Sequence, residues 1–388
     1  MSCRLAILRG WERVHHGDVQ TFAELARHGY EVRMVCSTKS RITEQQARMP
    51  LQRLRTPAFW GRFTRTIAGG YLMGLVSPIR YYDEYLYGFS RAVRDVDVLC
   101  GIDLMHPTCY QALREKRRGK RLVIQFWDNV PFNWPHDRPL REHYDAVLDG
   151  ADHFLVFSDD ADRTLRQQGV AAERRSRVNL GIDTAVWRPG ASEKPRREAL
   201  QVLCVGQVVW RKGIHTVLEA MDLAEVPVDL TIVGTGTEEA RLRWMVEQRQ
   251  RRGRPRLASH VRFLGPRFGE ELLRLRQEAD VQVAMSIPTP QWREQLNQSM
   301  LEGMACGLPP IASESGALPE IVRDGVEGLL VPPDFPPALA DAFTRLAREP
   351  ETRRRLGLAS RQRIERDFEL TRQGQALAEI LRAKVQAP

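Results

Sequence analysis

The sequence lacks the features of membrane-spanning and secreted proteins. No apolar run approaches the roughly 18 to 20 residues that a bilayer-spanning helix needs. The first residues, MSCRLAILRGWERV, contain no long apolar stretch followed by a small-residue cleavage site, so they predict a β-strand rather than a secretory signal peptide. We therefore expect a cytoplasmic protein, and peripheral contact at the inner membrane face is left open.

Cysteine pairs at metal-binding spacing are also absent. None of the six cysteines lies in a C-x-x-C pair, and several lie inside apolar runs. Such residues are typical of buried, reduced thiols, so we expect neither disulfides nor zinc. Asp95-Val96-Asp97 spells D-x-D, but it precedes an apolar strand, and we interpret it as structural. No metal site is predicted.

Positive charge, in contrast, is abundant. The formal net charge is +9, from 58 Lys and Arg against 49 Asp and Glu. A basic surface can bind nucleic acid, an anionic membrane or phosphorylated substrates, and solvated arginine-rich helix faces are an equal alternative. The sequence shows no platform of interleaved aromatic and basic residues, so we expect no nucleic-acid partner.

Apolar runs bounded by Gly and Pro alternate with helical patterns along most of the chain. This alternation predicts an α/β protein with doubly wound parallel sheets that carry helices on both faces. Strands are expected at 4–8, 31–37, 96–99, 121–126, 153–158, 201–205, 228–233, 261–264, 281–284 and 310–312. Two such domains facing one another would create a cleft outside the carboxyl ends of their strands.

The polar stretch GASEKPRR predicts a linker at 190–197. We expect one domain at 1–189, a second at 198–365, and a C-terminal helix at 366–388 that packs back on the first. Within the first domain, Arg53–Tyr82 mixes arginine with aromatic and aliphatic residues. This segment could contact a membrane or a lipid acceptor, and packing over the sheet is the favoured interpretation.

Two turns after predicted strands carry the residues of phosphate-binding loops. GQVVWRKG (206–213) ends in Arg211-Lys212 and opens a helix, which brings cations and backbone N–H groups together as a diphosphate requires. Basic residues at a helix start are, however, often only solvated. GTGTEE (234–239) lacks the third glycine of a dinucleotide-binding loop, and a tight strand-to-helix turn explains it at least as well.

Two carboxylates, Glu294 and Glu302, lie eight positions apart. Glu294 lies in a polar loop, and a helix is expected to begin just beyond it. If the intervening residues were helical, the two groups would be about 12 Å apart. That is too far for the carboxyl pair of a glycosidase, at about 5 to 9.5 Å, but it suits two groups that hold opposite ends of an extended ligand. The phosphates of that ligand would meet the helix N-terminus.

The run that contains both carboxylates resembles the retaining glycosyltransferase family 4, which has the GT-B fold of two facing Rossmann-like domains. The typical run of that family, E-x-F-G-x-x-x-x-E-A-M-A-x-G-x-P-V-V-A-S…G-x-P-E, is similar to the residues from Glu294 through PIASESGALPEIV (310–322). The other segments that match in order are NLGIDTAVWRP (179–189), VLCVGQVVWRKG (202–213), LTIVGTGTEE (230–239) and VRFLGPR (261–267). The N-terminal half matches loosely, through its strand–loop–helix start and AELARHGYEV (23–32).

The resemblance implies a role for each matched residue. Glu294 would contact sugar hydroxyls, Glu302 the nucleotide ribose, and Lys212 with Arg211 the diphosphate. The remaining implied substrate-binding positions are Leu296, Asn297 and Gln298 near the phosphates, Leu264 and Gly265 near the base, and Gly206, Gln207, Gly234 and Gly17.

Several positions depart from the family pattern. Gln207 replaces an arginine, for which Arg211 could substitute, and Leu296-Asn297 replaces a Phe-Gly pair. Trp127-Asp128 follows a strand where many members have a histidine near the reacting carbon. Asp128 could contact the sugar or only cap its turn.

The resemblance implies transfer of a sugar from a UDP-, GDP-, ADP- or dTDP-linked donor to a sugar, lipid-linked or small-molecule acceptor. It implies retention of anomeric configuration, no metal and no cofactor, in glycan, glycolipid or secondary-metabolite biosynthesis. The N-terminal domain would bind the acceptor and the C-terminal domain the donor. A nucleotide-sugar epimerase on the same fold is the alternative; it would need further acid/base carboxylates and no acceptor.

Overall fold

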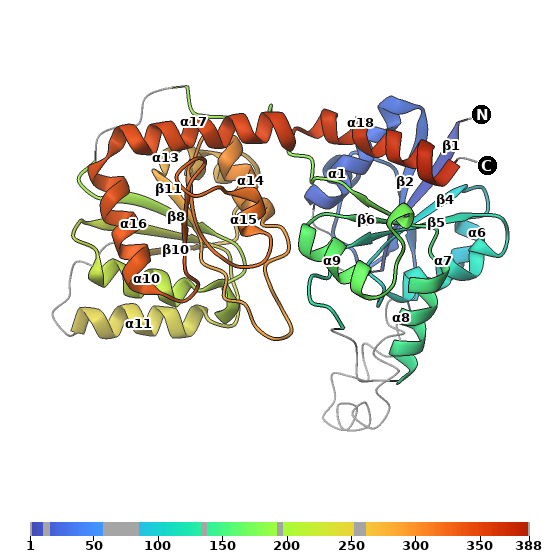
Figure 1. The fold of residues 1–388 in the computed structure, drawn as a ribbon, viewed down its shortest axis with the longest axis horizontal. Helices are drawn as coiled ribbons and strands as arrows, with labels where there is room; N and C mark the ends of the chain where they lie inside the picture. The colour runs from blue at the N-terminus through green and yellow to red at the C-terminus, as the bar shows by residue number, and fades with distance from the viewer. Residues whose placement is uncertain are drawn as a thin grey trace. The chain divides into compact units, whose positions relative to one another are not determined.

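The structure, a computed structural model, divides the chain into two compact units, each built on one parallel sheet (Figure 1). Unit 1 comprises Met1–Gly181 and Leu370–Pro388, and unit 2 comprises Ile182–Glu369. The structure describes residues 2–10, 16–56, 85–132, 138–191, 197–251 and 261–386. Most of Arg53–Tyr82 and most of the predicted linker at 190–197 lie outside these residues.

Unit 1 contains a seven-stranded sheet in the order β3-β2-β1-β4-β5-β6-β7, with neighbouring strands parallel. Its strands are β1 (Cys3–Arg9), β2 (Tyr30–Ser37), β3 (Leu51–Leu54), β4 (Val98–Ile102), β5 (Arg121–Phe126), β6 (His153–Val156) and β7 (Arg175–Arg177). Its helical segments are α1 (His16–Ala23), η1 (Glu24–His28), α2 (Glu44–Ala47), α6 (Phe89–Ala92), α7 (Pro107–Lys116), α8 (Arg138–Gly150), α9 (Asp159–Gln167), η3 (Ala172–Arg174), α18 (Leu370–Leu381) and η5 (Arg382–Gln386).

The central strand β1 is apolar on both sides because helices cover both faces of the sheet. Leu5 and Ile7 pack in one core with residues of α1, η1, α2 and α18. Ala6 and Leu8 point the opposite way and pack with residues of α6, α7, α8 and α9. A strand buried on both faces reads as a continuous apolar run, which is why Arg4–Leu8 predicts it well.

Unit 2 contains a six-stranded parallel sheet in the order β10-β9-β8-β11-β12-β13. Its strands are β8 (Leu200–Val205), β9 (Val228–Val233), β10 (Val261–Gly265), β11 (Val281–Ala284), β12 (Pro310–Ser313) and β13 (Leu329–Val331). Its helical segments are η4 (Trp210–Lys212), α10 (Ile214–Leu223), α11 (Glu239–Arg251), α13 (Gly269–Glu278), α14 (Gln298–Ala305), α15 (Leu318–Ile321), α16 (Pro336–Arg348) and α17 (Pro350–Asp367).

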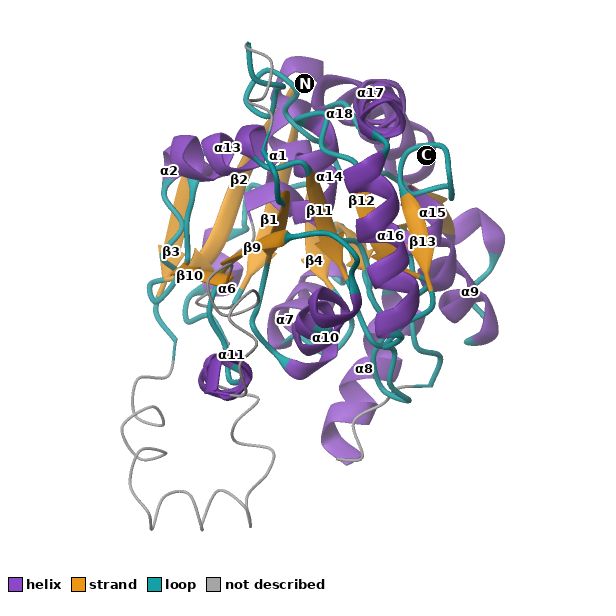
Figure 2. Cartoon of the chain, turned by 90° about the vertical axis from the view of Figure 1, so that its left-hand side faces the viewer, coloured by secondary structure: helices purple, strands orange, loops and turns teal. Residues whose placement is uncertain are grey.

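Helices cover both faces of the unit 2 sheet. The helices α10, α11 and α16 pack in one core with Val202 and other strand residues, whereas α13 packs on the opposite face with Leu203 and Val233. Figure 2 shows α13 and α14 on one side of these strands and α10 and α11 on the other. The predicted doubly wound α/β architecture is therefore confirmed in both units.

The first crossing between the units lies at Gly181–Ile182, before the predicted linker at 190–197. The reason is packing: Trp187 lies against the unit 2 core, and Arg361 donates hydrogen bonds to the carbonyls of Thr184 and Trp187. The second crossing, at Glu369–Leu370, leaves α18 in unit 1. There the hydroxyl of Tyr30 donates to the carbonyl of Ala378, at 3.4 Å.

All ten predicted strands have a counterpart, but the sequence pattern misses β3, β7 and β13. These strands have only four, three and three residues, and β7 is Arg175-Ser176-Arg177. A stretch that short has too few positions for an apolar period to be recognised.

The contact between α14 and β11 leaves no room for a side chain at Gly303. A Cβ atom there would lie 1.9 Å from Oε1 of Gln282, a buried residue of β11. The Gln282 amide donates to the carbonyls of Met300 and Leu308, at 2.8 and 3.4 Å, and so fixes α14 on the sheet. We predict that Gly303→Ala lowers the free energy of unfolding by about 1–3 kcal/mol through overpacking, measured by urea denaturation.

The matched control is Gly190→Ala, whose Cβ would make only ordinary contacts of 3.6 Å and more with Gln277. Combining Gly303→Ala with Gln282→Ala should cost less than the sum of the two single changes, because the second change removes the clash. Strictly additive effects would contradict this explanation.

Candidate functional site

The candidate site lies at the carboxyl ends of β8 and β11, where the strand order of unit 2 reverses. The loops that follow the two strands are held together: the N–H of Ile287 donates to the carbonyl of Arg211 at 2.8 Å. Gly213 has a φ of +62°, and a Cβ atom there would lie 2.0 Å from the carbonyl oxygen of Met285. Only glycine fits this close approach, so the sequence Arg211-Lys212-Gly213 brings its two cations to the β11 loop.

Lys212 and Glu294 form an ion pair within this site. The Nζ of Lys212 lies 2.5 Å from Oε2 of Glu294, and the hydroxyl of Ser286 donates to the same oxygen. The Glu294 side chain is only 6% exposed, whereas that of Lys212 is 22% exposed. A buried carboxylate is stable only when it is paired and hydrogen-bonded, so these two partners fix where Glu294 lies.

The backbone of Glu294 is held by the turn that follows β12. The N–H of Ala317 donates to the carbonyl of Glu294 at 3.0 Å. Gly316, with a φ of +54°, packs so closely that a Cβ atom would lie 1.9 Å from the same oxygen. The small residues Gly316 and Ala317 therefore allow the β12 turn to support the loop that carries Glu294.

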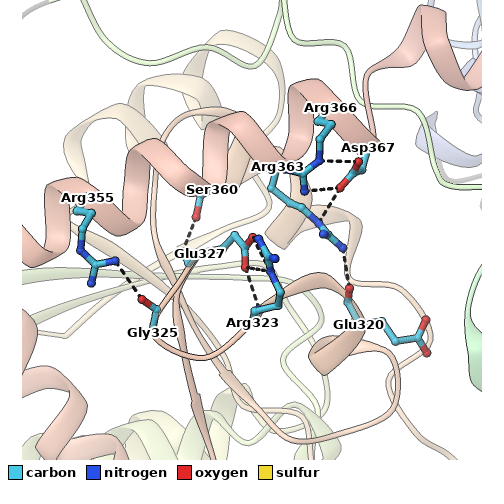
Figure 3. Close-up of polar contacts among 9 residues, drawn as sticks. All are labelled: Glu320, Arg323, Gly325, Glu327, Arg355, Ser360, Arg363, Arg366 and Asp367. Carbon is cyan, nitrogen blue, oxygen red and sulfur yellow. Dashed lines mark hydrogen bonds and ion pairs between the residues drawn. The ribbon is translucent and has the colours of Figure 1, made fainter.

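The segment beyond this turn is anchored to α17 (Figure 3). Ser360 and Arg355 donate to the carbonyls of Glu327 and Gly325 at 2.6 and 3.1 Å, and Arg363 donates to that of Glu320 at 3.2 Å. The Glu327 side chain is buried and pairs with Arg323. Burial acts to raise the pKa of Glu327, but the hydrogen bonds and charge of Arg323 outweigh it and hold the pKa below its ordinary value. The network fixes the far end of the segment that supports Glu294.

Glu302, in α14, has a separate set of partners. Its Oε2 lies 2.7 Å from Nη2 of Arg276, a fully buried residue of α13. Its Oε1 accepts a hydrogen bond of 2.8 Å from the amide of Gln298. Glu294 and Glu302 are thus held by different groups and do not share a partner among these contacts.

Asn297 caps α14. Its side chain accepts a hydrogen bond of 3.1 Å from the N–H of Met300, and its φ is −83°. Any residue can adopt this φ, so replacing the glycine of the family pattern by Asn297 demands no strained backbone. Leu296 precedes it and accepts at its carbonyl from the N–H of Gln298, at 3.0 Å.

Three glycine turns lie side by side at the ends of β8, β9 and β10. The N–H of Gly206 donates to the carbonyl of Val233 at 2.9 Å, and that of Gly234 donates to the carbonyl of Gly265 at 3.0 Å. Leu264 precedes Gly265 in β10 and packs partly buried on the α13 side of the sheet. The structure therefore brings these four predicted positions to one edge.

Arg211 and Gln207 lie together in the β8 loop. Nη2 of Arg211 donates to Oε1 of Gln207 at 3.3 Å, and its guanidinium carbon lies 4.9 Å from the centroid of the Trp292 ring. Nζ of Lys212 lies 5.2 Å from the same ring, so one indole faces both cations. The guanidinium of Arg211 thus lies beside Gln207, the residue that replaces the arginine of the family pattern.

Unit 1 places Asp128 at the carboxyl end of β5. Its Oδ1 accepts a hydrogen bond of 3.1 Å from the N–H of Val130, so it caps its own turn. Burial raises the pKa of Asp128 to about 6; the Val130 N–H opposes this shift and nearby Asp103 adds to it. Asp103 lies after β4, accepts from the N–H of Trp127 at 2.8 Å, and also has a pKa raised by burial.

Gly17 and His106 also belong to unit 1. Gly17 lies in α1, and His106 is the buried residue that precedes α7. The charge of His106 acts to lower the pKa of Asp103, against the larger effect of burial. The substrate-binding role that the resemblance implies for Gly17 stays a prediction.

Three residues at these sites were missed by sequence reasoning: Arg276, Ser286 and Asp103. Arg276 looks like one of many charged residues on an amphipathic helix, and Ser286 like an ordinary loop serine. A signal existed only for Asp103, because it lies a few residues after a predicted parallel strand, as Asp128 does.

Two observations concern the described part of the chain as a whole. No group of three or more His, Cys, Asp or Glu side chains there is placed to hold a metal ion. No helix there combines the length and apolar character needed to cross a membrane.

Two family models match the chain. The model described as glycosyl transferases group 1 matches residues 199–349, and the glycosyl transferase 4-like domain matches residues 19–181. The first match contains the unit 2 site and the second lies within unit 1. Together the two models cover most of the chain.

Curated relatives with similar sequences include a glycogen synthase and a glycosyltransferase. Glycogen synthase of Mycobacterium tuberculosis is 31% identical over 206 residues, which cover 52% of this chain and 47% of that protein. D-inositol 3-phosphate glycosyltransferase of Saccharomonospora viridis is 31% identical over 272 residues, 65% of this chain and 60% of that protein. The chain thus spans about half the length of the first relative and three fifths of the second.

Solved structures share the fold over the full chain. Anabaena HepE in complex with UDP matches with a TM-score of 0.74 and 17% identity, over 98% of this chain and 100% of that one. Sucrose-phosphate synthase from Thermosynechococcus elongatus matches with a TM-score of 0.76 and 21% identity, over all of both chains. The GT-B fold predicted for the chain is therefore confirmed.

The raised pKa of Asp128 predicts a pH dependence of stability. Folding holds the proton on Asp128 up to about pH 6, whereas the carboxyl's ordinary pKa is 3.8. The folded state thus binds more protons between these values, and stability falls as pH rises through this window. Asp128→Asn keeps an acceptor for the Val130 N–H but removes the charge. Relative to the wild type, its free energy of unfolding should rise by about 2–3 kcal/mol above pH 6 and by little near pH 4.

Urea denaturation from pH 4 to pH 8 measures this difference. Asp149→Asn, at an exposed position of α8, is the control and should leave the profile unchanged. Parallel profiles for the wild type and Asp128→Asn would show that Asp128 does not titrate in this window.

Proposed function

The chain belongs to the glycosyl transferases group 1 family, and on this premise we propose that it transfers a sugar from a nucleoside diphosphate sugar to an acceptor, with retention of anomeric configuration. The observation that carries the proposal is the Lys212–Glu294 ion pair at the reversal point of the unit 2 sheet. It places a cation for phosphate and a carboxylate for hydroxyl groups side by side, as the two ends of a sugar–phosphate bond require.

Glu294 orients the sugar in this proposal. Its carboxylate accepts hydrogen bonds from Ser286 and Lys212 on one oxygen, Oε2. A carboxylate is a hydrogen-bond acceptor and sugar hydroxyl groups are donors, so Glu294 is suited to bind the sugar. The close support from Ala317 keeps this orientation fixed, which is the positional precision that catalysis by orientation needs.

Lys212, Arg211 and the N-terminus of α14 stabilise the departing diphosphate. Bond breaking between the sugar and the diphosphate leaves negative charge on the diphosphate, and fixed positive groups aimed at that charge lower the barrier. Two side-chain cations come from η4, and the dipole of α14 adds positive potential at Asn297–Gln298. With these groups the reaction proceeds without a metal ion or another cofactor.

The donor's nucleotide is proposed to lie along the glycine turns. Glu302 holds the ribose, and the backbone at Leu264–Gly265 faces the base. UDP is the first nucleotide to test, because the similar HepE structures contain UDP or UDP-glucose. GDP, ADP and dTDP complete the panel, since the backbone turns do not by themselves select a base.

Unit 1 is proposed to bind the acceptor, with Asp128 near the reacting centre. The acceptor is a sugar, a lipid-linked sugar or a small molecule, in glycan, glycolipid or secondary-metabolite biosynthesis. The proposed location is the cytoplasm, with peripheral contact to the inner membrane face if the acceptor is lipid-linked. The epimerase alternative is not favoured, because the similar curated proteins named above are a glycogen synthase and a glycosyltransferase.

Donor turnover in EDTA tests the proposed site. Lys212→Ala should lower turnover by about a hundredfold or more, because it removes charge stabilisation of the leaving group. Glu294→Ala should lower it by a similar factor, because the sugar loses its orientation. The donor is first selected from UDP-, GDP-, ADP- and dTDP-sugars by thermal shift, since a bound donor raises stability by mass action.

Arg345→Ala, which removes an exposed cation of α16, is the control and should leave turnover unchanged. Undiminished transfer by both site variants would refute the site. Isomerised donor formed without any acceptor would favour the epimerase, and turnover that is lost in EDTA would refute metal independence.

A further inference from the structure

Arg276 is a fully buried charge that the proposed reaction does not yet use. It lies in α13 and is 0% exposed. Among the described residues it is the largest side chain that is fully buried. Removing a guanidinium from water is costly, and the cost is recovered only through good pairing. The polar and aromatic contacts of Arg276 therefore indicate how its burial is stabilised.

Within the described part of the chain, the polar contacts of Arg276 run to the first turns of α14. Nη2 lies 2.7 Å from Oε2 of Glu302 and donates to both the carbonyl and the hydroxyl of Ser299, each at 3.1 Å. The guanidinium carbon lies 4.2 Å from the centroid of the Trp187 ring. One nitrogen thus serves three acceptors, and the indole fixes the plane of the guanidinium.

The backbone of Trp187 is itself held by a hydrogen bond from α17. Nη1 of Arg361, in α17, donates to the carbonyls of Trp187 and Ala305, at 2.8 and 2.6 Å. Ala305 is the last residue of α14, so the same contacts connect Trp187 with the helix that carries Glu302. The Trp187 ring that packs on Arg276 is therefore held close to α14, the helix that carries Glu302.

We propose that Arg276 is the positioning residue of the nucleotide site: it fixes the Glu302 carboxylate so that it can accept the 2′- and 3′-hydroxyls of the donor ribose. This assignment rests on the proposed function, in which Glu302 binds the ribose. Arg276 holds Oε2 and Gln298 holds Oε1, so the carboxylate is fixed at both oxygens. A carboxylate has about four acceptor positions, so about two remain for a vicinal diol.

A purely structural ion pair explains the arrangement less well. The Glu302 side chain is 13% exposed while that of Arg276 is 0% exposed, so the carboxylate lies outward of the cation. Among the described residues, no hydrogen-bond partner faces Nε or Nη1 of Arg276. Apolar residues of similar volume commonly replace buried pairs without loss of stability. The buried position of Arg276 costs free energy, and two of its nitrogens lack partners among the described residues. This cost is explained if the role of Arg276 is to orient the Glu302 carboxylate, which lies outward of it.

The test separates orientation of the ribose from general support of the fold. Affinities for UDP and for 2′,3′-dideoxy-UDP are measured by calorimetry on the wild type and on Arg276→Met, or for the GDP or ADP pair if the thermal-shift panel selects that base. We expect Arg276→Met to weaken UDP binding about tenfold or more. We expect it to bind the dideoxy form as the wild type does, within about twofold, because that ligand has no hydroxyls for Glu302. Glu302→Ala should show the same pattern, and Arg276→Met should add little to it.

Arg274→Gln, an exposed arginine on the same helix, is the matched control and should change neither affinity. Arg276→Lys keeps the positive charge and is measured in case the Met variant does not fold. It should have a UDP affinity between those of the Met variant and the wild type. An equal loss for both ligands, or no loss for either, would overturn the positioning role. If the wild type binds no nucleoside diphosphate at all, the proposed function itself fails and the assignment of Arg276 falls with it.

Discussion

A buried carboxylate that must be paired is the constraint on which the unit 2 site depends. Glu294 is buried, and its Oε2 is stabilised by Lys212 and Ser286, which come from the loops after two different strands. The pair can form only if β8 and β11 are neighbours, because Lys212 follows one strand and Ser286 with Glu294 follows the other. The parallel sheet places β8 and β11 side by side, and the Lys212–Glu294 ion pair then fixes the geometry of the site.

The arginines of unit 2 extend the same principle to the rest of the site. Arg361 and Arg363 donate to backbone carbonyls, and Arg276 pairs with Glu302 beneath the helix that carries it. A guanidinium has five donors in a planar fork, so one residue can hold several carbonyls that would otherwise lack partners. The basic residues, which the sequence alone attributes equally to solvated faces, therefore include cations that hold the structure of unit 2 together.

The sequence predicted the fold well because buried parallel strands read as continuous apolar runs. The helix α14 also begins a few residues beyond Glu294, as expected. The arrangement of Glu294 and Glu302 at two ends of a ligand, inferred from their spacing, stays a prediction. The sequence could not predict that Lys212 and Glu294 pair, since they are 82 positions apart and their contact is set by strand order. Arg276 was missed because nothing local distinguishes a buried arginine on a charged helix, and the boundary near Gly181 was missed because Trp187 packs on unit 2.

The central claim is that Lys212, held beside Glu294, is the cation that meets the donor's diphosphate. The most direct measurement compares the affinities of the wild type and Lys212→Met for UDP and for UMP, which share base and ribose and differ by one phosphate. The account predicts that the variant loses about tenfold or more for UDP and clearly less for UMP, so that the advantage of the second phosphate disappears. Equal losses for the two ligands, or no loss for UDP, would contradict it.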